Sequence, residues 1–82
     1  MMTTPWSKSV VVKLGEPPAE MIVETTQAAA WAMIEDWPME DGAFLDRALE
    51  ICAAVDKGKR KPEDARQAFV DAATEAGVLL RA

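Results

Sequence analysis

The chain has 82 residues, no histidine, a single cysteine and a net charge of −5. A chain of this length forms one domain, residues 1–82, that buries only about 60–65% of the surface its unfolded form exposes, so its core is thin. The acidic balance argues against a general binder of nucleic acid or of membrane surfaces. Without histidine, the usual catalytic triads and imidazole metal sites are excluded.

The sequence carries no sign of a membrane span or a signal peptide. No apolar run approaches the roughly 18 residues that suggest a spanning helix, and residues 1–6 lack a basic segment followed by an apolar one. The single Cys52 cannot form an internal disulfide, which fits a reducing compartment. We therefore expect a cytoplasmic protein without membrane contact.

The N-terminal part of the chain alternates between apolar and polar residues, as strands do. Residues 6–14 are rich in β-branched types and predict a strand. Residues 15–18 include two prolines and predict a loop, and residues 19–24 alternate again. The two segments therefore predict a β-hairpin. The residues expected on the buried face of its first strand are Trp6, Val10, Val12 and Leu14.

The remainder of the chain has apolar residues at helical spacing, and we expect helices over residues 25–37, 42–57 and 62–76. Pro38 cannot continue a helix and ends the first one. Asp41 can accept hydrogen bonds from the first free backbone N–H groups of the second. The predicted fold class is α+β, with an N-terminal two-stranded β-hairpin packed on three α-helices in the order ββααα.

Residues at the expected helix ends support these boundaries. Thr25 or Thr26 can cap the first helix, and Pro62 suits the first position of the third. Gly58 and Gly77 suit the left-handed conformation that often follows a helix, and the apolar tail after Gly77 should be docked. The residues expected on the buried helix faces are Ala30, Met33, Ile34 and Trp37, then Phe44, Ala48, Ile51, Cys52 and Val55, then Ala65, Phe69, Ala72, Ala73 and Ala76.

Small residues and aromatic anchors recur through these helices in a defined order. The pattern resembles that of a family of small bacterial proteins catalogued as domain of unknown function number 982, over roughly residues 10–78. The resemblance implies no activity, cofactor or site residue. The residues that carry it are Trp37-Pro38, Gly42, Ala48, Cys52, Gly58, Ala65-Arg66, Ala68-Phe69, Ala72-Ala73 and Ala76-Gly77.

Glu35, Asp36, Glu40 and Asp41 form an acidic turn on either side of Trp37-Pro38. Glu35 and Asp36 fall in the last turn of a helix, where a negative charge opposes the helix dipole by roughly 0.3–1 kcal/mol if exposed. The acids can be solvated caps, a surface for a basic partner or oxygen ligands for a divalent cation. Because their spacing is not that of an EF-hand loop, we expect no metal site.

Lys57, Lys59, Arg60 and Lys61 form a basic turn that holds four of the chain's nine basic residues. A basic turn between two helices invites a helix-turn-helix interpretation. The next helix, however, begins Pro62-Glu63-Asp64, and its carboxylates would face DNA phosphates. We therefore expect no general nucleic-acid binding, and keep as the alternative function a regulator that contacts nucleic acid through the basic turn.

Catalytic chemistry finds little support. Cys52 lies on an expected apolar helix face, which indicates a structural thiol rather than a nucleophile. The glycines are too scattered for a phosphate-binding loop. We expect neither an enzyme nor a cofactor. Because Trp31 lies at the edge of its helix's apolar stripe, a small-ligand pocket near Trp31 and Trp37 is a third hypothesis.

The leading prediction is a non-enzymatic protein–protein interaction module with an unidentified protein partner. The second helix would separate the acidic turn from the basic turn by about 24 Å, giving the domain two oppositely charged poles. A homodimer is also expected through the first strand, because a two-stranded sheet leaves that strand an unpaired edge. Lys8 and Lys13 are the charges that protect it.

Overall fold

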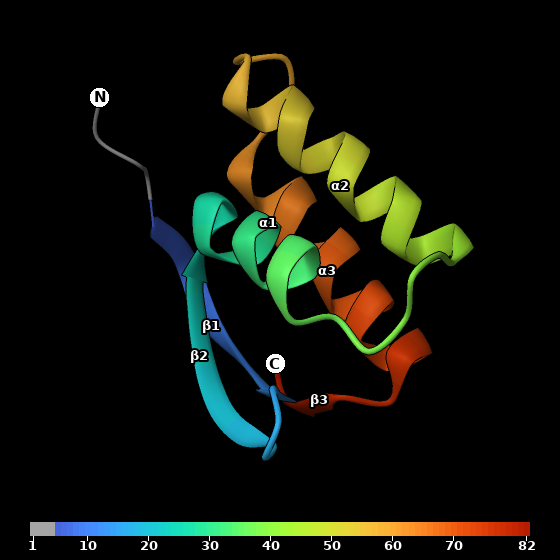
Figure 1. The fold of residues 1–82 in the computed structure, drawn as a ribbon. Coiled ribbons are helices and arrows are strands. Elements are labelled where there is room, and N and C mark those ends of the chain that lie inside the picture. Colours follow the sequence, from blue (N-terminus) through green and yellow to red (C-terminus); the bar gives the residue numbers. More distant parts are fainter. Residues whose placement is uncertain (1–4) are drawn as a thin grey trace.

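The computed structural model describes residues 5–82, in which the first and third of three helices pack against one face of a three-stranded antiparallel sheet and the second helix packs on those two (Figure 1). Residues 1–4 of the expected domain lie outside the described part. The α+β class and the hairpin are confirmed. The elements are β1 (Pro5–Leu14), β2 (Ala19–Thr25), α1 (Thr26–Glu35), α2 (Ala43–Asp56), α3 (Pro62–Ala76) and β3 (Leu79–Arg81).

The strand β1 is central in the sheet, which has the order β2-β1-β3. It pairs antiparallel with β2 in a register that runs from Val10 opposite Val23 to Leu14 opposite Ala19. The predicted inner face of β1 is confirmed, since Trp6, Val10, Val12 and Leu14 are all buried. The alternation of the sequence therefore identified which side of β1 meets the helices.

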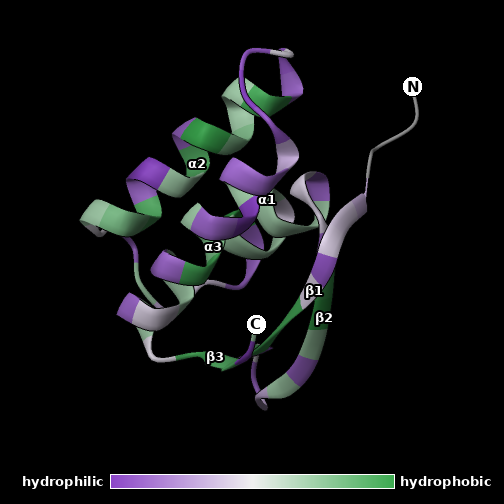
Figure 2. Ribbon diagram, turned by 180° about the vertical axis from the view of Figure 1, so that it is seen from behind, coloured by the Kyte–Doolittle hydropathy of each residue, from purple (hydrophilic) through white to green (hydrophobic). Residues whose placement is uncertain are grey.

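The expectation of a two-stranded sheet is wrong, because the C-terminal tail adds β3 to the other edge of β1. The pairs are Val11 with Arg81 and Val12 with Leu79, and the Lys13 N–H donates to the Val78 carbonyl at 2.9 Å. Figure 2 shows hydrophobic residues where the two strands meet. β3 occupies the edge on which the expected dimer through the first strand depended, so that premise is also wrong.

The beginning of β1 is joined to α3 through side chains. The Ser7 N–H and Oγ–H donate to the Glu63 carboxylate at 3.3 and 2.7 Å, and the Arg66 Nε–H donates to the Lys8 carbonyl at 2.9 Å. The register between β1 and β2 shifts in this stretch, between Pro5 and Val10. The side chains of α3 thus satisfy backbone groups that a neighbouring strand would otherwise pair.

Two helix ends follow the predicted local chemistry. The Thr25 Oγ accepts a hydrogen bond from the Ala28 N–H at 3.0 Å at the start of α1. After α3, Gly77 adopts φ 73°, and the Val78 N–H donates to the Ala73 carbonyl at 3.0 Å, as in a Schellman cap. This cap directs the tail toward the sheet, where β3 begins.

The connection between α1 and α2 corrects two boundaries. α1 ends at Glu35 with Asp36 as its C-cap, because the proline after Trp37 disfavours the helical conformation there. α2 begins at Ala43, and its N-cap is Gly42, without a side-chain hydrogen bond. The expected cap by Asp41 is therefore wrong by one position.

The core is built around Phe69 of α3, which is fully buried. The rings of Trp6 and Trp37 lie against it, with centroids 5.9 and 5.6 Å away. The Trp6 Nε1–H also donates to the Thr26 Oγ at 3.1 Å. Alanines on the buried sides of all three helices let the helices approach one another and the sheet closely. The buried alanines are Ala29, Ala32, Ala48, Ala65, Ala68, Ala72 and Ala73.

The buried face of α1 differs from the expected one. Ala29, Ala32 and Met33 are buried, whereas Ile34 is 67% exposed. In α2 the expected Phe44 is 44% exposed, and Leu45 is buried in its place. α1 is apolar on nearly every side, so the spacing of its apolar residues could not identify the side that faces the core.

Candidate functional site

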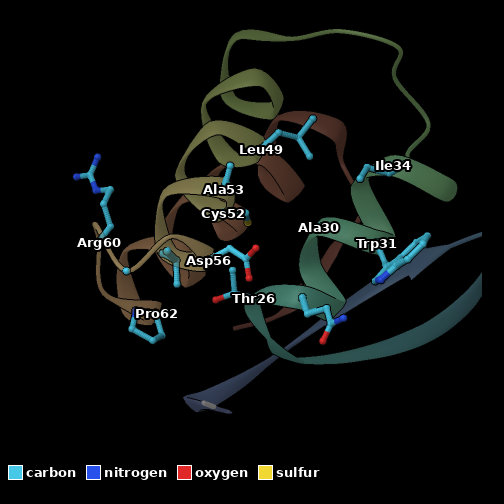
Figure 3. Close-up of a pocket in the computed structure, with 13 residues that line it drawn as sticks. Thr26, Ala30, Trp31, Ile34, Leu49, Cys52, Ala53, Asp56, Arg60 and Pro62 are labelled. Atoms are coloured by element: carbon cyan, nitrogen blue, oxygen red, sulfur yellow. The ribbon is translucent and has the colours of Figure 1, made fainter. Parts of the chain in front are cut away.

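α1 and α2 run antiparallel beside one another (Figure 1). Side chains from both helices line a groove of about 770 Å³ (Figure 3). Apolar side chains from both helices line its middle. Polar and charged side chains line one end: Thr26 and Gln27 from the start of α1, Asp56 from the end of α2 and Arg60 from the turn that follows. The residues of the apolar middle are Ala30, Trp31, Ile34, Leu49, Cys52 and Ala53.

The α1 wall of the groove carries two large, exposed apolar side chains. Trp31 is 56% exposed and Ile34 is 67% exposed. They are three residues apart, so they lie on the same side of the helix. Because α1 packs on the core through small residues such as Ala29 and Ala32, its bulkiest side chains face outward. Exposed apolar groups beside a concave surface are characteristic of binding sites.

The opposite wall and the floor come from α2. Figure 3 shows Leu49, Cys52 and Ala53 across the groove from the α1 side chains. Burial raises the pKa of the Cys52 thiol from its ordinary 9.0 to about 11. The thiol is therefore protonated at neutral pH and acts as an apolar floor rather than as a nucleophile.

The basic turn lies at the end of the groove where α1 begins and α2 ends. The Arg60 Nε lies 3.5 Å from the Asp64 carboxylate, and both side chains are exposed. Within residues 5–82, no ion pair engages Lys57, Lys59 or Lys61. These exposed ammonium groups lie in the turn beside this end of the groove, which Asp56 and Arg60 line.

The acidic turn lies at the opposite end, along the connection from α1 to α2 (Figure 1). Glu35 is the last residue of α1 and Asp36 is its C-cap, so both charges oppose the helix dipole, as the sequence predicted. In the part of the chain that the structure describes, neither acid has an ion-pair partner. Among the same residues, no group of three or more potential metal ligands gathers at the turn or elsewhere.

The structure therefore places the predicted site residues at two separated poles, all of them exposed, and does not bring the poles together. The apolar groove that joins them was not predicted. Of the proposed pair near a ligand pocket, Trp31 lines the groove, whereas Trp37 is partly buried against Phe69. The signal for the groove in the sequence is that Trp31 and Ile34 share one side of a helix whose alanines can face the core.

Trp37 has a structural role, because it packs against the core. Its indole Nε1–H is buried and has no acceptor among the described atoms. The ring packs against Phe69, with centroids 5.6 Å apart. As for membranes, each helix of residues 5–82 is too short or too polar to cross a bilayer.

The fold and the groove define a small α+β domain in which a helical layer covers one face of an antiparallel sheet and carries an apolar groove on its surface. The sequence model of the family described as "Protein of unknown function (DUF982)" matches residues 8–80, and the chain belongs to this family. The resemblance in the sequence is thereby confirmed. No curated protein and no solved structure matches the chain.

Proposed function

We propose that this protein is a non-enzymatic protein–protein interaction module whose binding surface is the groove between α1 and α2. The exposure of Trp31 and Ile34 beside an apolar hollow carries the proposal. Full burial of one large apolar side chain contributes roughly 1.5–3 kcal/mol. A partner that covers both therefore gains a substantial part of its binding free energy from α1 alone.

The chemistry of the groove supports binding rather than catalysis. Its floor thiol, Cys52, stays protonated at neutral pH. The ionisable side chains that line it, Asp56 and Arg60, are exposed and come from the end of α2 and the turn that follows. A buried, protonated thiol also accords with the cytoplasm, where we propose that the protein acts.

A groove between two antiparallel helices fits an amphipathic helix, which binds through apolar side chains at positions i, i+3, i+4 and i+7. The basic turn and the acidic turn at its ends would fix the direction of that helix. A small ligand is a weaker match. Sites of about 300–1,000 Å³ hold small ligands through a few convergent polar groups, whereas the polar side chains that line this groove, Thr26, Gln27, Asp56 and Arg60, all come from the end where α1 begins and α2 ends.

Contact with nucleic acid through the basic turn is the alternative. Asp64 lies 3.5 Å from Arg60, and Glu63 precedes it, so carboxylates reduce the positive potential of this surface. A gel-shift titration at about 150 mM salt separates the two functions. Micromolar binding of random duplex that is lost when Lys59, Arg60 and Lys61 become alanine would favour the alternative.

The proposed function is tested by photo-crosslinking in living cells. A photoreactive residue at Ala53 points into the groove, and the same residue at the exposed Glu20 of β2 is the control. We expect a discrete protein adduct from position 53, its loss in the Trp31→Ala background, and no such adduct from position 20. No adduct from position 53, or the same adducts from both positions, would contradict the proposal.

A further inference from the structure

The charges around the groove are arranged with opposite signs at its two ends. The acidic turn, Glu35, Asp36, Glu40 and Asp41, lies where α1 leads into α2, and the basic turn lies where α2 leads into α3. A two-fold axis that crosses the middle of the groove at right angles to its length reverses the direction of a second copy. Each acidic turn then faces a basic turn, and this contact occurs twice.

The apolar middle fits the same arrangement. A two-fold interface brings one surface patch against itself, so it must be self-complementary in shape. Here a hollow between two helices is bordered by the projecting Trp31 and Ile34, which are more than half exposed. The side chains that project from one copy can occupy the hollow of the other.

The position of Glu35 and Asp36 adds an independent reason. Both oppose the dipole of α1 and lack an ion-pair partner within the described residues of their own chain. The ammonium groups of Lys59 and Lys61, which no ion pair engages within residues 5–82, are at the other pole. Because charges of opposite sign across an interface favour one orientation of the partner, the reversed second copy is selected over a parallel one.

We infer that the occupant of the groove is a second copy of this chain, docked groove to groove about a two-fold axis. This inference rests on the proposed function of the groove and names its partner. It replaces the first strand as the route to a homodimer, because β3 and the side chains of Glu63 and Arg66 already bind that strand.

The experiment is sedimentation equilibrium of the full chain at tens of micromolar, with circular dichroism to verify that each variant is folded. We expect the wild type to have the mass of two chains. Trp31→Ala should raise the dimer dissociation constant at least tenfold. Ile22→Ala removes a side chain that is 62% exposed on β2 and should change the constant less than twofold.

Substitutions that reverse charges in the two turns test the orientation of the second copy. Lys59→Glu with Lys61→Glu cancels the four positive charges of the basic turn, and Glu35→Lys with Asp36→Lys cancels the four negative charges of the acidic turn. Each variant alone should dimerise at least tenfold more weakly than the wild type. An equimolar mixture should form a heterodimer, because the charges introduced in one variant face introduced charges of opposite sign in the other. A mixture that stays monomeric while the wild type dimerises would overturn the two-fold arrangement.

A wild-type chain that is monomeric at several hundred micromolar would overturn the second copy as occupant. If the crosslink from position 53 then joins a different protein, the proposed function stands and this inference alone fails. If neither self-association nor a crosslink occurs, both fail. A dimer that Trp31→Ala leaves intact and Ile22→Ala disrupts would place the interface on the sheet and overturn the groove.

Discussion

β1 and α1 each have 10 residues, and they use their largest apolar side chains in opposite ways. β1 directs Trp6 and its alternate apolar residues into the core, where they are buried. α1 fills its core-facing side largely with alanine and leaves Trp31 and Ile34 exposed. A helix that packs closely through small residues keeps its bulky ones for the surface. The difference separates side chains that hold the fold from side chains available to a partner.

The largest loss of stability is expected when Phe69, in the core, is replaced. This residue is fully buried and contacts the rings of Trp6 and Trp37. Phe69→Ala should lower the free energy of unfolding by about 3–5 kcal/mol, through lost burial and the cavity left behind. Urea denaturation followed by circular dichroism measures this. A loss below about 1 kcal/mol would show that the core is organised around other residues.

A smaller change in stability, one that depends on pH, is expected from Cys52, where the core meets the floor of the groove. Burial raises its pKa from 9.0 to about 11, so the folded state retains the thiol proton after the unfolded state has lost it. Its contribution to stability is complete below pH 9.0 and is lost as the pH rises toward about 11. The slope is at most about 1.4 kcal/mol per pH unit.

The measurement is the difference in unfolding free energy between the wild type and Cys52→Ala, followed from pH 8 to 11. The comparison removes the background titration of the lysines, which both chains share. The difference should change only above pH 9.0, the ordinary value for a thiol. A difference that is constant across this range would mean that the thiol ionises as it does in water, and that the groove floor is wet.

A still smaller effect is expected where α3 binds the start of β1. Hydrogen bonds from the Ser7 Oγ–H and N–H lower the pKa of the Glu63 carboxyl. The contribution of Glu63 to stability is therefore present above its unfolded pKa and lost as the pH falls through the lower folded value. Ser7→Ala removes the first-named hydrogen bond, and should raise the pKa of Glu63 in an NMR titration. An unchanged pKa would show that this contact does not persist in solution.

The parts of the fold with strong local signals could be predicted from the sequence. α3 was predicted to the residue, because Pro62 favours a helix start and Gly77 a helix end. The alternating residues of β1 identified its inner face. β3 was missed because three residues are too few for an alternating pattern to emerge, although the sequence did indicate a docked tail.

The candidate site was harder to predict than the fold. The charged turns are visible in the sequence, and both lie exposed at the surface. The groove depends on which side of α1 faces the core, and a helix with apolar residues on nearly every side does not reveal this. Ile34 was consequently assigned to the core, and its exposure became evident only when α1 was seen packed against α2 and the sheet.

The most direct test of the division between core and binding side chains is to measure stability and association on the same variant, Trp31→Ala. Because Trp31 is 56% exposed, its removal should change the free energy of unfolding of the monomer by no more than about 0.5–1 kcal/mol. The same variant should lose the groove crosslink and associate at least tenfold more weakly. A stability loss above about 2 kcal/mol with association unchanged would make Trp31 a core residue and contradict the account.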